Sequence, residues 1–146
     1  MKGGPVIDAN LIAPCGMNCS RCSAYLAFLN KIPKQRGQIF QCIGCRPRNK
    51  QCAYLKGQCE LLTANKIQFC FACGRYPCDR LRKFDQRYRR SYGVSPIQNL
   101  ETIRKKGVKS FLRQQTRAHG CPTCGGMISI HNKKCFACDK VERWKA

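Results

Sequence analysis

The stretch Ala13-Pro-Cys-Gly-Met-Asn-Cys-Ser-Arg-Cys-Ser-Ala-Tyr25 places three cysteines within eight residues. A second triad of cysteines lies much later, between residues 70 and 78. Thiolates at such short spacings are ligands of zinc and of iron–sulfur clusters. If the two triads meet, they close the chain across residues 22–70 and tie the N-terminal half together. The six residues are Cys15, Cys19, Cys22, Cys70, Cys73 and Cys78.

The composition gives the cysteines a structural role. The chain has 146 residues and 14 cysteines, and 28 Lys and Arg against 7 Asp and Glu give a formal charge of +21. Leu, Ile, Val and Phe make up about a fifth of the chain, close to the composition of disordered proteins. Metal–thiolate bonds are the obvious candidates to stabilise a fold whose hydrophobic core is so small. The length suits one domain, with or without a small appendage, and excludes a large multidomain enzyme.

The beginning of the chain lacks the charged segment and apolar run of a signal peptide, so we expect a cytoplasmic protein. No stretch approaches about 18 consecutive apolar residues, so we expect no membrane span. In a reducing compartment, clustered cysteines bind metal rather than form disulfides.

Five cysteine pairs have the C-x-x-C spacing, which is more than random placement gives. Two thiolates at that spacing can turn inward from one tight loop and occupy two corners of a tetrahedron around a metal. A second loop of the same kind then supplies the other two corners. The pairs are Cys19/Cys22, Cys42/Cys45, Cys70/Cys73, Cys121/Cys124 and Cys135/Cys138.

The C-terminal pairs resemble a zinc ribbon. Gly125 and Gly126 follow the first pair, and a short β-type run over residues 127–130 precedes a polar turn around Asn132. We expect a four-thiolate structural zinc site, which is closed and therefore argues for a scaffold and against zinc catalysis. Its ligands would be Cys121, Cys124, Cys135 and Cys138.

The middle cysteines predict a second four-thiolate site. Cys42 and Cys45 form a pair, and Cys52 and Cys59 each follow six or seven residues further along. The two single cysteines lack the pair spacing, so the alternative is that they serve other sites.

The two N-terminal triads leave several alternatives open. Six thiolates can make one four-thiolate site with two to spare, a two-zinc cluster with bridging sulfurs, or the ligands of an iron–sulfur cluster. In the last case Cys15, Cys19 and Cys22 would hold a [4Fe–4S] cluster with one cysteine of the second triad, which implies a redox or enzymatic role. If every site holds zinc, the chain binds about three zinc ions.

Several motifs carry a resemblance to a known family. Residues 13–25, Cys42-x-Gly-Cys45, Phe69-Cys-Phe-Ala-Cys73 and Tyr76-Pro-Cys-Asp79 resemble, in order, the cysteine-rich family of bacteria and archaea catalogued as domain of unknown function 3795. The likeness spans roughly residues 12–115, and the attached ribbon is similar to what some members carry. The resemblance implies a metal-binding domain and leaves its biochemical role open.

Between the cysteines the sequence predicts helices. Residues 23–30 are compact and apolar, and residues 79–92 carry an apolar stripe of Leu81, Phe84, Tyr88 and Tyr92, with Gly93 placed to end the helix. Ser95 and Pro96 then open a helix that runs to Lys106 and stops at Gly107. Residues 110–117 predict a further short helix.

These features together predict a small, metal-stapled α+β protein. Residues 1–117 would form a cysteine-rich helical domain, and residues 118–146 a zinc-ribbon β-hairpin.

The positive charge predicts a polyanionic partner, of which nucleic acid is the commonest. Residues 80–117 hold 12 basic and 2 acidic side chains. Some cations would instead offset the negative charge of nearby thiolates, and a solvated helix face is the plain alternative. The candidate contact residues are Arg82, Lys83, Arg87, Arg90, Lys105 and Lys106.

Other roles have less support in the sequence. Seven carboxylates and two histidines give no set of nucleophile, base and orienting group, so we expect no hydrolytic enzyme. We expect His119 and His131 at the surface, and Tyr88 and Tyr92 in the core. A protein partner on the apolar stripe of residues 81–92 is a further alternative.

Overall fold

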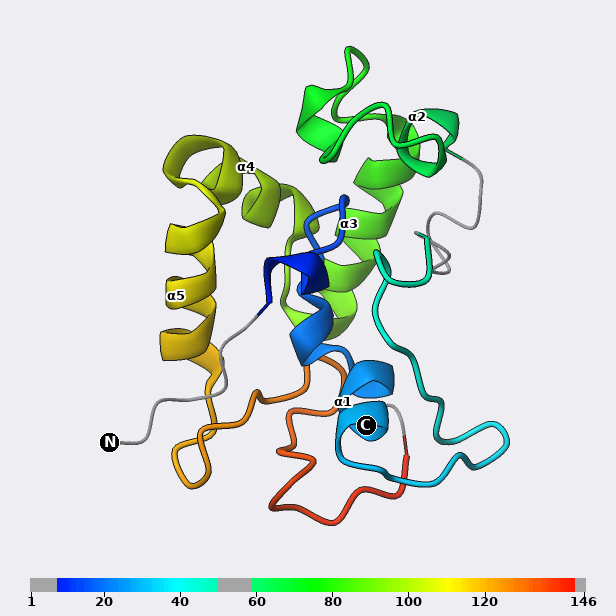
Figure 1. Cartoon of the computed structure of the whole chain (residues 1–146), viewed down its shortest axis with the longest axis vertical. Helices are drawn as coiled ribbons and strands as arrows, with labels where there is room; N and C mark the ends of the chain where they lie inside the picture. The colour runs from blue at the N-terminus through cyan, green and yellow to red at the C-terminus, as the bar shows by residue number, and fades with distance from the viewer. Residues whose placement is uncertain (1–7, 50–58, 144–146) are drawn as a thin grey trace.

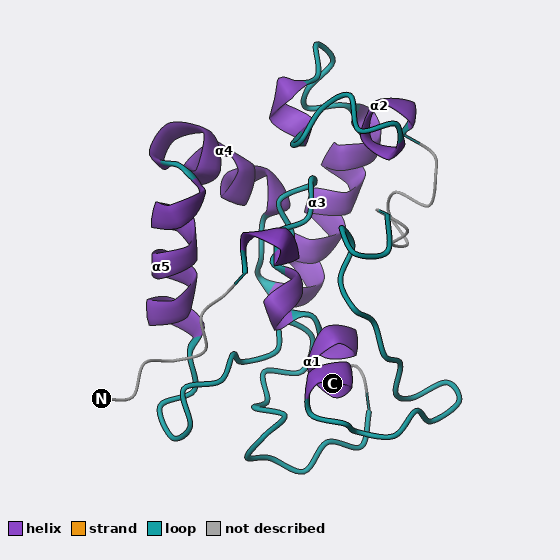
Figure 2. Ribbon diagram, viewed as in Figure 1, coloured by secondary structure: helices purple, strands orange, loops and turns teal. Residues whose placement is uncertain are grey.

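A computed structural model describes residues 8–49 and 59–143, and within these residues the protein is built from helices joined by long loops (Figures 1 and 2). The longer helices α3, α4 and α5 pack in sequence order, and in Figure 1 the loops over residues 30–40 and 120–143 lie at the lower end of the molecule, while the chain after residue 40 rises beside α3. The elements are the 3₁₀ turns η1 (Ala9–Leu11), η2 (Cys19–Arg21) and η3 (Cys70–Ala72), and the helices α1 (Ser23–Leu29), α2 (Glu60–Thr63), α3 (Asp79–Tyr92), α4 (Pro96–Lys106) and α5 (Val108–His119).

Residues 11–21 run through the centre of this structure, and every one of them is buried. Four segments that are distant in sequence donate hydrogen bonds to carbonyl groups of this stretch. A buried carbonyl without a partner is costly, so these bonds fix where the neighbouring segments lie. They run from Arg46 Nε to Ile12 (2.7 Å), from the Cys70 amide to Pro14 (2.9 Å), from Asn99 Nδ2 to Gly16 (3.0 Å) and from the Ile130 amide to Arg21 (2.8 Å).

Gly16 allows α4 to approach the central stretch closely. Its φ of 91° lies in the region that favours glycine, and a Cβ at this position would clash with the carbonyl oxygen of Pro96 at the start of α4. The first turn of α4 therefore rests directly on the backbone of residue 16.

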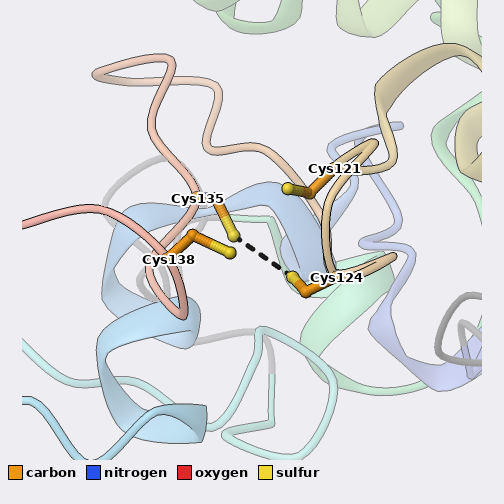
Figure 3. Close-up of side chains that lie close together, drawn as sticks. All are labelled: Cys121, Cys124, Cys135 and Cys138. Atoms are coloured by element: carbon orange, nitrogen blue, oxygen red, sulfur yellow. Dashed lines mark hydrogen bonds between the residues drawn. The ribbon is translucent and has the colours of Figure 1, made fainter.

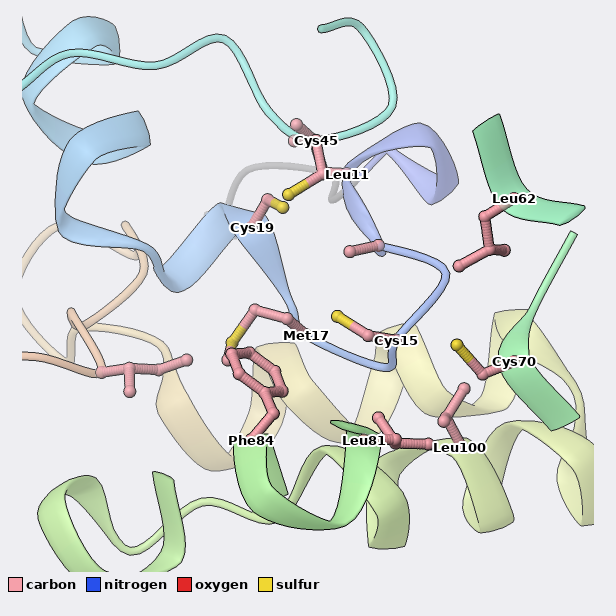
Figure 4. Close-up of a cluster of buried hydrophobic side chains, with 12 residues drawn as sticks. Leu11, Cys15, Met17, Cys19, Cys45, Leu62, Cys70, Leu81, Phe84 and Leu100 are labelled. Carbon is pink, nitrogen blue, oxygen red and sulfur yellow. The ribbon is translucent and has the colours of Figure 1, made fainter. Parts of the chain in front are cut away.

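The main hydrophobic core surrounds the same stretch. Figure 4 shows Cys15, Met17 and Cys19 among apolar side chains from α3 and α4. Leu81 and Leu100 are fully buried there, and Phe84 is 8% exposed. The apolar stripe of α3 is thus used inside the fold, with Tyr88 and Tyr92 packed against the cluster as the sequence predicts.

The predicted helices are confirmed, with one extension. α1 and α3 occupy the expected ranges, and Gly93 ends α3 with a φ of 69°. At α4, the Ser95 side chain accepts a hydrogen bond from the Gln98 amide at 3.0 Å, as an N-cap should. The last helix, α5, begins one residue after Gly107 and is longer than predicted.

Asp85 of α3 joins that helix to the start of α4. Its carboxylate is 4% exposed and accepts hydrogen bonds from the Ser95 hydroxyl (2.6 Å) and the Ile97 amide (2.9 Å). Arg89, one turn further along α3, donates to the same carboxylate at 2.7 Å. Asp85 thus supplies partners for groups that the start of α4 leaves unpaired.

The prediction of a β-hairpin, and with it the α+β class, is not confirmed within the described residues. The C-terminal segment makes only isolated bridges, between Gly120 and Met127 and between Ile128 and Cys135. Part of its backbone bonds elsewhere: Ile130 donates to Arg21, whose guanidinium in turn donates to the Ile128 carbonyl at 2.9 Å, while the Ser129 amide still donates across the turn to the Lys134 carbonyl at 3.0 Å. The described chain is therefore mostly helical.

His131 is buried, so its predicted place at the surface is wrong. Only 4% of the residue is exposed. Nδ1 accepts a hydrogen bond from the Ser23 amide at 3.2 Å, and Nε2 lies 3.1 Å from the Tyr88 hydroxyl. Both ring nitrogens are engaged, so His131 connects the C-terminal segment to α1 and α3. His119 is partly exposed.

The boundary predicted between residues 117 and 118 stays a prediction. The contacts of Ile130 and His131 cross it, as does a hydrogen bond between the Ser23 and Ser129 hydroxyls at 2.6 Å. Among the described helices, none is long and apolar enough to cross a membrane.

Replacing Asp85 by Ala should destabilise the fold, because it leaves buried donors at the start of α4 unpaired. We expect a loss of about 1–3 kcal/mol. The matched control is Asp79→Ala on the same helix, whose carboxylate is largely exposed and pairs with Arg82 at 3.4 Å; it should cost less than about 1 kcal/mol. Thermal unfolding of the metal-loaded protein measures both, and equal effects would contradict the role of Asp85.

Candidate metal centres

Four cysteines of the C-terminal segment converge on one point. The sulfur atoms of Cys121, Cys124, Cys135 and Cys138 all lie within 4.8 Å of one another, and Figure 3 shows them facing inward from two loops. Sulfurs bound to one zinc at about 2.3 Å stand about 3.8 Å apart in a tetrahedron. The Cys124 and Cys135 sulfurs are 3.5 Å apart, much farther than a disulfide bond allows. This cluster can hold a metal ion.

The loops that carry these cysteines have backbone conformations and hydrogen bonds that suit metal binding. Gly125 has a φ of 79°, and the Gly126 amide donates to the Cys124 sulfur at 3.3 Å. At the second pair, the Cys135 amide donates to the Asp139 carboxylate at 2.8 Å. Backbone amides directed at sulfur are the usual surroundings of a metal-bound thiolate.

The thiols of the cluster differ in acidity. Amide hydrogen bonds from Cys124 and Thr123 lower the pKa of Cys121 to about 7. Hydrogen bonds to the neighbouring sulfurs of Cys124 and Cys135 raise the pKa of Cys138 to about 12. One thiolate therefore forms readily, and a bound cation must displace the remaining protons.

The cluster is anchored to the helical part by apolar contacts. Met127 and Phe136, which lie beside its cysteines in the chain, are buried against Leu26 and Ala27 of α1 and against Ile39. The position of the cluster is therefore set by α1.

Five other cysteines line one cavity in the N-terminal half, with a volume of about 180 Å³. Cys15, Cys19 and Cys45 are 1–8% exposed, and Cys22 and Cys42 are partly exposed. Burial raises the pKa of the Cys22 thiol to about 12. The structure thus brings the first N-terminal triad together with Cys42 and Cys45.

The other predicted ligands lie in several places. Cys59 precedes α2, Cys78 precedes α3, and Cys73 ends the turn η3. Cys70 is buried in the main core. Cys52 lies outside the described residues, so the second four-thiolate site predicted from Cys42, Cys45, Cys52 and Cys59 stays a prediction.

A comparison with protein-family models finds one match, to a protein of unknown function (DUF3795), over residues 11–83. The matched region begins with the buried central stretch and ends within α3. The chain belongs to the DUF3795 family. The resemblance expected from the sequence is thereby confirmed. Neither the curated proteins nor the solved structures searched gave a match.

In this DUF3795 protein, the candidate nucleic-acid residues are all exposed on two helices. Those of α3 span an arc of about 140° on the side away from Leu81 and Phe84. The pair at the end of α4 also lies where cations favour the helix dipole. The residues are Arg82, Lys83, Arg87 and Arg90 on α3, and Lys105 and Lys106 on α4.

Two arginines that the sequence interleaves with the middle cysteines, Arg46 and Arg48, lie near thiols of this DUF3795 protein. Arg46 donates to the carbonyls of Ile12 and Gln68 at 2.7 Å each, which holds it beside the buried cysteines. Arg48 donates to the Cys42 sulfur at 3.4 Å. Arg46 directly follows Cys45 and Arg48 lies three residues after it, and cations beside thiolates offset negative charge.

Replacing Cys135 by Ser should remove one metal ion per chain, because three thiolates hold a structural ion poorly. Elemental analysis of purified full-length protein measures the loss. The control is Thr123→Ser, an exposed residue between the first two ligands that should leave the metal content unchanged. Full metal content in Cys135→Ser would contradict the site.

Proposed function

We propose that the protein is a zinc-binding scaffold that presents the basic face of α3 to nucleic acid. The observation that carries the zinc assignment is the convergence of four sulfurs within 4.8 Å. Four cysteine ligands and tetrahedral spacing favour zinc, and a closed four-thiolate site leaves no position for a substrate. The metal therefore has a structural role.

The nucleic-acid assignment rests on the exposed face of α3. Lys83 and Arg90 project from the side opposite the core, whereas Arg87 lies at the edge of this face over the rings of Phe84 and Tyr88. The two aspartates of α3 pair with other arginines of the helix: Asp85 is buried and binds Arg89, and Asp79 pairs with Arg82. A rigid helix with closely spaced cations suits the regularly spaced phosphates of a nucleic acid.

A protein partner on the apolar stripe of α3 is less well supported. Leu81 and Phe84 are buried, so this stripe is not offered to a partner. The large apolar side chains that are exposed lie on α1 and on the loop after it, at Phe28, Leu29, Phe40 and Ile43.

The double variant Lys83→Glu plus Arg90→Glu tests the nucleic-acid assignment. If both residues contact phosphates, affinity should fall about tenfold or more, and the slope of log affinity against log salt should flatten by about two. Fluorescence anisotropy with single-stranded RNA and with duplex DNA measures both quantities. Arg87 is left intact because it also lines the cysteine cavity.

The control is Lys34→Glu plus Arg36→Glu, an equal change of charge on the exposed loop after α1. It should retain most of the affinity. Equal losses in the two double variants would show that net charge alone drives binding, and no binding by the unaltered protein would contradict the proposal.

A further inference from the structure

The cavity in the N-terminal half is too large for a single ion. Its volume of about 180 Å³ compares with about 10–15 Å³ for a void that holds one water molecule. Five thiols line it and come from two segments, one that runs through the buried centre and one that follows α1. They are Cys15, Cys19 and Cys22 from the first segment, and Cys42 and Cys45 from the second.

The arrangement of these sulfurs differs from that of the C-terminal cluster. Among the described residues, only Cys121, Cys124, Cys135 and Cys138 bring three or more ligand atoms within 4.8 Å of one another. The five cavity thiols surround a volume instead of meeting at one point, although Figure 4 shows Cys19 and Cys45 directed toward each other. Ligands of a polynuclear cluster stand apart in this way, because each binds a different metal atom.

We propose that four of these five cysteines bind a [4Fe–4S] cluster in this cavity. The site joins the first N-terminal triad to Cys42 and Cys45, a grouping that the chain order does not suggest. The proposed cluster does not depend on the C-terminal metal ion or on nucleic-acid binding, so the three proposals can be tested separately.

The walls of the cavity suit such a cluster. Met17, Phe84 and Tyr88 give the cavity a largely apolar lining beside the thiols. A [4Fe–4S] core with a charge of +2 carries a net charge of −2 once four thiolates bind it, and Arg48 and Arg87 line the same cavity as counter-charges.

Hydrogen bonds to sulfur support the proposal at Cys42. The Gly44 amide donates to its sulfur at 3.3 Å, and Arg48 donates to the same atom at 3.4 Å. Donors of this kind stabilise the thiolate and tune the reduction potential of iron–sulfur clusters. Binding of the cluster displaces the thiol protons, and the iron–thiolate bonds that form offset the cost of ionising these buried groups.

The first experiment is iron, sulfide and zinc analysis of the full chain, produced in iron-supplemented bacteria and purified without oxygen. We expect brown protein with about four iron and four acid-labile sulfide per chain, and zinc in addition at the C-terminal cluster. Colourless protein with zinc in place of iron would overturn the proposal, whatever its affinity for nucleic acid.

Single Ser variants of the five cysteines then test the ligand set. Four should lose iron and sulfide while keeping the C-terminal zinc, and the fifth should keep both. Cys135→Ser is the reciprocal control, which should lose zinc and keep iron, and Cys73→Ser should keep iron because Cys73 lies outside the cavity lining. Loss of iron from Cys73→Ser, with retention in Cys42→Ser and Cys45→Ser, would overturn this grouping.

Arg48→Gln tests the site without removing a ligand, since Arg48 is an exposed side chain and its loss should leave the fold intact. Removal of a positive charge beside the cluster disfavours the added electron, so the reduction potential should become more negative. Titration with dithionite, followed by the visible absorption of the cluster, measures it. The control Arg36→Gln should leave the potential unchanged, and an unchanged potential in Arg48→Gln would contradict a cluster at this place.

Discussion

The burial of residues 11–21 is the constraint on which the rest of the structure depends. This stretch is a series of turns that pairs only some of its backbone groups internally, so its other buried carbonyls need donors from elsewhere. Arg46, Cys70, Asn99 and Ile130 supply them from four separate parts of the chain. These donors bring the segments that carry most of the described cysteines around one centre.

The cysteines take the place that larger apolar residues hold in other proteins of this size. Cys15, Cys19, Cys45 and Cys70 all belong to the main core cluster. A thiol contributes little buried area, so packing alone gives modest stability there. Bonds from the cavity thiolates to a metal cluster would supply cohesion at the same place, and the C-terminal cluster would do the same for residues 120–143. Metal binding by the thiols would thus explain both the high cysteine content and the small apolar fraction of the chain.

The sequence predicted most of the helical part and the C-terminal cluster, because both depend on local signals. The apolar stripe of α3, the Ser95 cap and the C-x-x-C pairs each specify their structure within about 15 residues. The pairing of Cys42 and Cys45 with the first triad depends on which segments meet, which spacing alone does not reveal. The β-hairpin was expected because residues 127–130 have β-type side chains, but the Ile130 amide and the Ile128 carbonyl bond to Arg21, which leaves only isolated bridges. His131 was placed at the surface because four cysteines already suffice as ligands of the ribbon site, and its actual partners Ser23 and Tyr88 are distant in sequence.

We assign metal–thiolate bonds to two separate places in this protein with its small hydrophobic core, and X-ray absorption spectroscopy of the anaerobically purified protein would observe these bonds directly. At the zinc edge, four sulfur neighbours at about 2.3 Å are expected. At the iron edge, sulfur neighbours with further iron atoms close by are expected. Zinc surrounded mainly by nitrogen or oxygen, together with no iron signal, would contradict the assignment of both sites.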